Sequence, residues 1–261
     1  MTREALAEEL SDLVERYRHS TAALEVFVGN SLKSIDQNRA TMLEALKKIR
    51  GALRGEEPVT EPGVETVSVA MSTDEWEALA NVVTKHSRYF ELHPQMLLEM
   101  SLAYAGALFE AFISDVLITI LRNIPERLRS GRTLTVEEVL RFRDRDELIE
   151  DLIHREVLDL MYKSAEKQFD YFRTSFGVDV FEDKSLMVSI AGLAAVRERR
   201  NLVAHNNGLA SAEYIAKFDT NAAVGDRVVS DAESAGSDRK VLSKVAIALA
   251  SRLRDELTPA D

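Results

Sequence analysis

The chain has 261 residues, of which 46% are hydrophobic and 30% charged, and its formal net charge is −11 at pH 7. This length is enough for one large helical domain or two smaller units. The negative charge argues against a protein that coats nucleic acid, although a local basic site remains compatible with it. Cysteine is absent, which excludes disulfides and thiolate metal sites. The first residues lack a signal-peptide core, so a cytoplasmic protein is expected.

Residues 1–55 are predicted to form one long helix, or two nearly continuous ones. Apolar residues recur every three or four positions, and the repeat shifts once, as at a coiled-coil stutter. The stripe consists of Leu6, Leu10, Leu13, Tyr17, Leu24, Val28, Leu32, Ile35, Met42, Leu46, Ile49 and Leu53. It could form a coiled coil with a second chain or fold back on the rest of the protein, and the sequence leaves both open.

Residues 56–71 are predicted to be a linker, because Pro and Gly occur there among acidic residues, with a short extended piece at 67–70. Residues 72–261 are predicted to be an all-α domain. A capping box at 72–75 opens a helix that ends near 86 or 89, and Pro94 begins the next, which ends near 123. Its most apolar part contains Glu99, Glu110 and Asp115, which favours a buried bundle helix over a membrane span.

The remaining elements follow from caps and turn residues. We expect a short turn at 125, a short helix opened by a capping box at 135–138, helices at 146–175 and 184–206 separated by Gly177, a strand at 226–229, a polar segment at 230–239 and a final helix at 240–257. With so little β-type alternation, the predicted class is all-α.

The most informative stretch ends the helix expected at 184–206. Its apolar arc, which includes Leu193, continues into Arg197, Arg200, Asn201 and His205. Polar groups on a core-facing stripe cost free energy unless they are paired or face a cleft or partner, so a site is expected there. The residues Asn206-Asn207-Gly208 then provide a helix stop.

The string Arg200-Asn201-x3-His205, followed by Asn206-Asn207-Gly208 and Tyr214, resembles the signature of HEPN-domain proteins. This α-helical superfamily includes metal-independent ribonucleases of toxin–antitoxin and anti-phage systems. Segments 109–115 and 123–128 are also similar to the first long helix of such domains and the residues after it. The resemblance spans 75–256 and implies a HEPN-like helical bundle, preceded here by the N-terminal helix or coiled coil.

The resemblance implies RNA cleavage at a composite site in which two such motifs face each other across a homodimer, without metal or cofactor. Arg200, Asn201 and His205 would be catalytic. Histidine transfers protons near neutral pH, and arginine binds phosphate oxygens with a planar fork. Asn201 lies four residues before His205 and could hold its imidazole by a hydrogen bond. The expected products are a 2′,3′-cyclic phosphate and a 5′-hydroxyl.

Supporting roles are assigned to Glu110, Arg197, Asn206 and Tyr214. Glu110 needs a partner in its apolar helix, for which Arg200 or Arg197 is the candidate, unless it lies at the bundle edge. Asn206 is expected to cap the helix first and to touch substrate second, and Tyr214 is expected to pack rather than react. Arg199 is interpreted as one of several solvated charges. Seven arginines between 122 and 145 could guide RNA, but solvated surface charges are the commoner explanation.

The leading hypothesis is therefore an endoribonuclease of toxin or anti-phage defence, with RNA and an antitoxin or regulator as partners and no membrane. Two alternatives stay open: a catalytically silent binding or regulatory module of the same fold, and a coiled-coil scaffold that works through its N-terminal helix. The other histidines lack metal-ligand spacing, and there is no glycine-rich phosphate loop.

Overall fold

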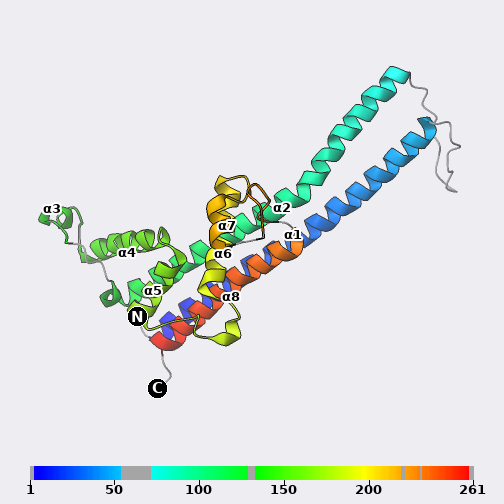
Figure 1. Ribbon diagram of the computed structural model, residues 1–261. Helices are drawn as coiled ribbons and strands as arrows, with labels where there is room; N and C mark the ends of the chain where they lie inside the picture. The colour runs from blue at the N-terminus through cyan, green and yellow to red at the C-terminus, as the bar shows by residue number, and fades with distance from the viewer. Residues whose placement is uncertain (1–2, 54–71, 129–132, 219–220, 230, 259–261) are drawn as a thin grey trace. The chain divides into compact units, whose positions relative to one another are not determined.

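The computed structural model describes residues 3–53, 72–128, 133–218, 221–229 and 231–258, and within these ranges the protein is all-helical, as expected (Figure 1). The α-helices are α1 (Arg3–Leu53), α2 (Thr73–Asn123), α3 (Val136–Val139), α4 (Arg145–Met161), α5 (Ala165–Phe176), α6 (Ile190–His205), α7 (Ala212–Phe218) and α8 (Ala232–Leu257). Two 3₁₀ turns, η1 (Pro125–Arg127) and η2 (Lys184–Leu186), complete the set.

The chain divides into two compact units whose borders fall inside α1 and α2. We call residues 1–24 and 99–261 the body and residues 25–98 the insert. The expected borders lay instead at either end of the linker. That linker, 56–71, and its extended piece at 67–70 lie outside the described residues.

The N-terminal part of α1 belongs to the body because its apolar stripe is buried there. Leu6, Leu10, Leu13 and Tyr17 are all buried. The ring of Tyr17 packs on that of Phe112 from α2, with centroids 4.5 Å apart. Of the two possibilities open for the N-terminal helix, this part folds back within its own chain.

Helix α2 runs through Pro94 without a break, so the expected helix start at this proline is wrong. An internal proline removes one backbone hydrogen bond and costs about 3 kcal/mol or more. The helix continues because its following turns are anchored in the core, where Leu102, Phe109 and Leu117 are buried. Its segment Leu92–Asn123 is long and apolar enough to cross a membrane by length and composition alone, and half of its most apolar window is buried inside the structure.

Two of the expected helices have different boundaries, because a serine caps a helix inside each predicted range. The helix expected at 146–175 is two helices, because Ser164 caps α5 and accepts a hydrogen bond from the backbone of Lys167. The helix expected at 184–206 starts only at Ile190, after Ser189 accepts from Gly192 N at 3.0 Å.

The elements of the C-terminal region also differ from those predicted. Helix α8 begins at Ala232, within the segment expected to be irregular, because Asp231 caps it and accepts from Ser234 N at 2.8 Å. The strand expected at 226–229 is reduced to one antiparallel bridge between Arg227 and Leu209. Helix α7 had not been expected. Both predicted capping boxes, at 72–75 and 135–138, are confirmed.

Candidate functional site

Helix α6 carries the predicted motif and packs against α5 and α8 of the body. Leu193, Val196 and Leu202 on this helix are buried. The side chains of Arg197 and Arg200 are only 17% and 20% exposed, so two guanidinium groups lie at the edge of the core. Charges in such a position need partners to offset the loss of hydration.

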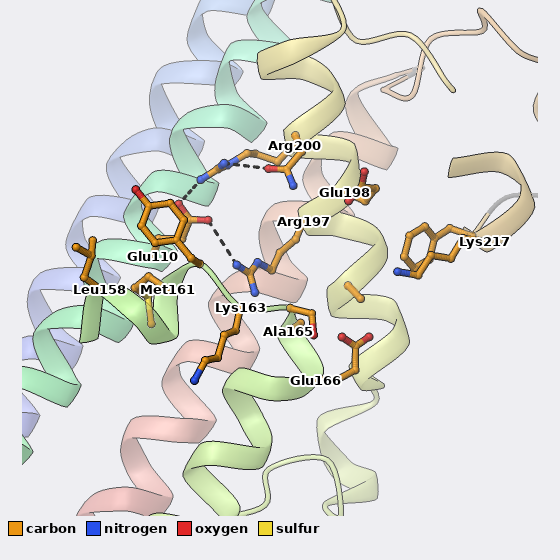
Figure 2. Close-up of a pocket in the computed structure, with 15 residues that line it drawn as sticks. Glu110, Leu158, Met161, Lys163, Ala165, Glu166, Arg197, Glu198, Arg200 and Lys217 are labelled. Atoms are coloured by element: carbon orange, nitrogen blue, oxygen red, sulfur yellow. Dashed lines mark hydrogen bonds and ion pairs between the residues drawn. The ribbon is translucent and has the colours of Figure 1, made fainter. Parts of the chain in front are cut away.

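Glu110 of α2 is the shared partner of these two arginines. Its Oε2 accepts a hydrogen bond from Arg200 Nη2, and its Oε1 lies 3.8 Å from Arg197 Nη2. Figure 2 shows the carboxylate between the two guanidinium groups. Arg200 also donates from Nη1 to Asn201 Oδ1 at 3.1 Å. The sequence offered Arg200 or Arg197 as the partner of Glu110, and the structure joins it to both.

Arg197 has a second partner in Gln168, which is buried on α5. Arg197 Nη1 donates to Gln168 Oε1 at 2.7 Å, while the amide nitrogen of Gln168 donates to the carbonyl of Leu160 at 3.0 Å. Burial lowers the pKa of Arg197 below its ordinary value, and the charge of Glu110 opposes this shift. Sequence reasoning missed Gln168, because nothing in its local pattern marks it as a partner for an arginine.

Gly106 of α2 allows Arg200 to reach Glu110. A Cβ atom at Gly106 would lie 2.9 Å from both Cγ and Nε of Arg200, closer than side chains pack. Glycine inside a helix costs about 1 kcal/mol relative to alanine, so its position in this apolar helix has a packing reason. A residue with a side chain would obstruct the path of Arg200 to the carboxylate one turn further along.

Replacing Gly106 by alanine is therefore expected to separate stability from site geometry. Alanine gains about 1 kcal/mol of helix propensity, which offsets the cost of moving Arg200, so the urea midpoint should change little. The displaced Arg200 should lose its bond to Glu110, which a crystal structure of the variant would show. Gly29, whose added Cβ meets nothing within 4 Å, is the matched control in α1. An unmoved Arg200 in Gly106→Ala would contradict the argument.

These residues form one wall of a pocket of about 560 Å³ inside the body. Helix α2, the α4–α5 junction, α6 and α7 all contribute to it (Figure 2). The lining residues are Glu110, Leu158, Met161, Tyr162, Lys163, Ser164, Ala165, Glu166, Ala194, Arg197, Glu198, Arg200, Asn201, Lys217 and Phe218. The structure thus brings together four of the predicted site residues: Glu110, Arg197, Arg200 and Asn201.

His205 does not line this pocket. It is the last residue of α6, about one turn beyond Asn201, and its side chain is exposed. The expected hydrogen bond from Asn201 is absent among the described residues, because the Asn201 oxygen accepts from Arg200 instead. No hydrogen bond or ion pair with another described residue orients the imidazole.

The predicted helix stop after His205 is built as expected. Asn207 and Gly208 have positive φ angles of 52° and 71°. Asn206 is the C-cap of α6, because its backbone N–H donates to the carbonyl of Leu202 at 2.8 Å. Its side chain donates to the carbonyl of Leu209 at 2.8 Å and so stabilises the turn that follows. A Cβ at Gly208 would lie 2.5 Å from Glu99 Oε1, so this turn requires glycine.

Arg199 is not the solvated charge that the sequence suggested. It donates from Nε to Asp238 Oδ2 of α8 at 2.7 Å and from Nη1 to the hydroxyl of Tyr214 at 3.2 Å. Asp238 is buried, and Tyr214 packs against Phe218 with ring centroids 5.8 Å apart. Burial alone would lower the pKa of Arg199, but its hydrogen bonds and the charge of Asp238 raise it. This pair fastens α6 to α8.

Three of the five described arginines between 122 and 145 pair with acidic neighbours, and Arg127 donates to the carbonyl of Ser175 at 2.8 Å. Arg122 forms a two-pronged ion pair with Glu150, with contacts of 2.7 to 2.9 Å. Arg141 pairs with Glu137 and Arg143 with Glu147. Arg129 and Arg132 lie outside the described residues. The observed pairs favour the interpretation as ordinary surface charges.

No group of three or more metal-ligating His, Asp or Glu side chains occurs within the described ranges. Comparisons with known proteins add no assignment: no family model, no curated protein and no solved structure matches this chain.

Proposed function

We propose that the protein is a metal-independent endoribonuclease of the HEPN type. The observation that carries this proposal is the layout of α6. Arg200 and Asn201 face a pocket, and an exposed His205 follows about one turn later on the same helix. Metal-free RNA cleavage needs a cation for the phosphate and groups that accept and donate protons, for which imidazole is suited.

In the proposed reaction, one imidazole takes the proton of a ribose 2′-hydroxyl. The 2′-oxygen attacks the adjacent phosphorus, and the bond from phosphorus to the 5′-oxygen breaks. That oxygen receives a proton from a second, protonated imidazole, which leaves a 2′,3′-cyclic phosphate and a 5′-hydroxyl. His205 is the one histidine on this arc, so the second imidazole comes from a second copy of the chain in a homodimer.

Glu110 sets the resting state of Arg200 in this proposal. The carboxylate holds the guanidinium at the pocket edge and balances its charge in a half-buried setting. A scissile phosphate competes for the same donors, because carboxylate and phosphate oxygens both fit the arginine fork. Activity of this kind fits toxin or anti-phage defence in the cytoplasm, with an antitoxin or another regulator keeping it in check.

A silent binding module is the second candidate, and one observation favours it. Arg200 is already satisfied by Glu110 and Asn201, while His205 stands outside the pocket. In that case the pocket recognises a partner and no bond is cleaved.

The decisive experiment is incubation of purified protein with total cellular RNA in EDTA, followed by mapping of the new ends. We expect cleavage with 2′,3′-cyclic phosphate and 5′-hydroxyl ends. Cleavage that appears only after Mg²⁺ is restored, or that leaves other ends, would contradict the mechanism. Intact RNA that nevertheless co-purifies with the protein would support the binding module.

A further inference from the structure

An exposed aromatic side chain stands at the pocket. Tyr162 is 84% exposed, although it lines the pocket and sits at the junction of α4 and α5. Its backbone is held in place, because its N–H donates to the carbonyl of Leu158 at 3.3 Å. An aromatic ring that is left in water on a fixed backbone offers a flat apolar surface to a ligand.

Two lysines of the pocket are available as cations. Lys163 follows Tyr162, and its ammonium group makes no ion pair with any described residue. Lys217 likewise makes no ion pair in the described part of the chain, and its Nζ lies 4.8 Å from the centroid of the Phe218 ring. Its charge does act on Glu166, another lining residue, and helps to lower the pKa of that carboxyl. Arg197 and Arg200 deeper in the wall are held by Glu110. The lysines, rather than the arginines, are therefore ready to meet an anion.

The pocket wall also contains a hydrogen-bond donor, the side-chain amide of Asn201. The carboxamide oxygen of Asn201 accepts from Arg200, whereas its NH₂ group has no partner among the residues described. The volume of about 560 Å³ lies within the range of about 300–1,000 Å³ typical of ligand pockets. An aromatic face, unpaired cations and a free amide donor are what a nucleotide requires for its base, its phosphate and its base edge.

We propose that this pocket binds one unpaired RNA nucleotide, with its base stacked on Tyr162 and its phosphate bound by Lys163, the next residue along the chain. The inference rests on the proposed function and specifies its substrate as single-stranded RNA. A base within a duplex is already stacked on its neighbours and cannot also stack on Tyr162.

The site lies beside the reacting groups rather than at them. Five residues of helix separate Arg200 from His205, a rise of about 7.5 Å, which is on the order of one nucleotide step. In this proposal, the phosphate next to the bound nucleotide lies along α6, between Arg200 and His205. Tyr162 is a positioning residue in this arrangement, because it grips a neighbouring nucleotide and does not touch the scissile bond.

The test is binding of a short fluorescein-labelled 2′-O-methyl RNA, measured by fluorescence anisotropy on the full chain. The methyl group blocks the attacking hydroxyl, so this assay reports binding alone. We expect the single strand to bind at least about 10-fold tighter than a duplex of the same sequence. Tyr162→Ala should weaken single-strand binding by about 5- to 150-fold, and Tyr162→Phe should stay within about 2-fold of wild type.

The matched control for Tyr162→Ala is Tyr104→Ala, which removes an exposed tyrosine of α2 outside the pocket and should bind like wild type. Lys163→Ala should weaken binding, whereas its control Lys184→Ala, at an exposed lysine outside the pocket, should not. Equal losses in Tyr104→Ala and Tyr162→Ala, or equal affinities for single strand and duplex, would overturn the nucleotide pocket. If wild type cleaves RNA but Tyr162→Ala binds normally, this inference fails and the nuclease stands. If Tyr162 governs binding but no RNA is cleaved, the pocket stands and the nuclease fails.

Discussion

His205→Ala is expected to slow RNA cleavage by about 10²- to 10⁴-fold, the usual contribution of a general acid or base. The substitution removes the imidazole and leaves Arg200, Asn201 and their contacts in place. Because His205 is exposed at the end of α6 and makes no side-chain hydrogen bond or ion pair with a described residue, the fold should not change. Initial cleavage rates in EDTA, with urea midpoints measured in parallel, check both parts of this expectation.

The matched control is His154→Ala, an exposed histidine of α4. It should cleave like wild type. An active His205→Ala protein would rule out the proposed chemistry, and an equal loss in both variants would show that the effect is not specific to the imidazole of His205. Binding of the 2′-O-methyl strand should survive in His205→Ala, since this residue lies outside the pocket.

Asp238→Ala is expected to destabilise the body by about 3 kcal/mol. Asp238 is 8% exposed and is the acidic partner of Arg199, which is itself only 21% exposed. Removing the carboxylate leaves a guanidinium near the core with the Tyr214 hydroxyl as its remaining partner. A urea titration followed by circular dichroism should show a lower midpoint with an unchanged slope.

The exposed pair of Asp170 with Arg173 provides the comparison, because it joins the same residue types in water. Asp170→Ala should cost less than about 1 kcal/mol. The double variant Arg199→Leu Asp238→Leu should recover most of the lost stability, since an apolar pair can replace a buried ion pair. Equal losses at the buried and exposed pairs would contradict this account.

The sequence was sufficient for the helical class but not for its boundaries. Apolar periodicity identified the stripe of α1, whose members from Leu6 to Val28 are buried, because such patterns reflect burial directly. Pro94 was taken as a helix start, although packing further along α2 outweighs its local cost. Ser164, Ser189 and Asp231 fix where α5, α6 and α8 begin, and caps of this kind occur at many positions that start no helix.

The site was predictable where charge conflicted with burial. Glu110 in an apolar helix demanded a cation, and that argument led to Arg200 and Arg197. Helical spacing suggested an Asn201–His205 hydrogen bond, which the described side chains do not form, since spacing ignores a competing donor such as Arg200. Tyr162 and Lys217 come from other elements, which only the tertiary fold brings to one pocket. Gly106 did carry a signal, as a glycine inside an otherwise apolar helix.

The division of the chain also bears on how the protein is made. The body consists of residues 1–24 and 99–261, which precede and follow the insert in the sequence. During synthesis, Tyr17 leaves the ribosome long before Phe112, the ring on which it packs. The apolar face of the first helix therefore cannot pack on the core of α2 until the insert and that part of α2 have been translated. Removing the N-terminal 55 residues would therefore remove part of the body itself and expose Phe112 and the core around it to solvent.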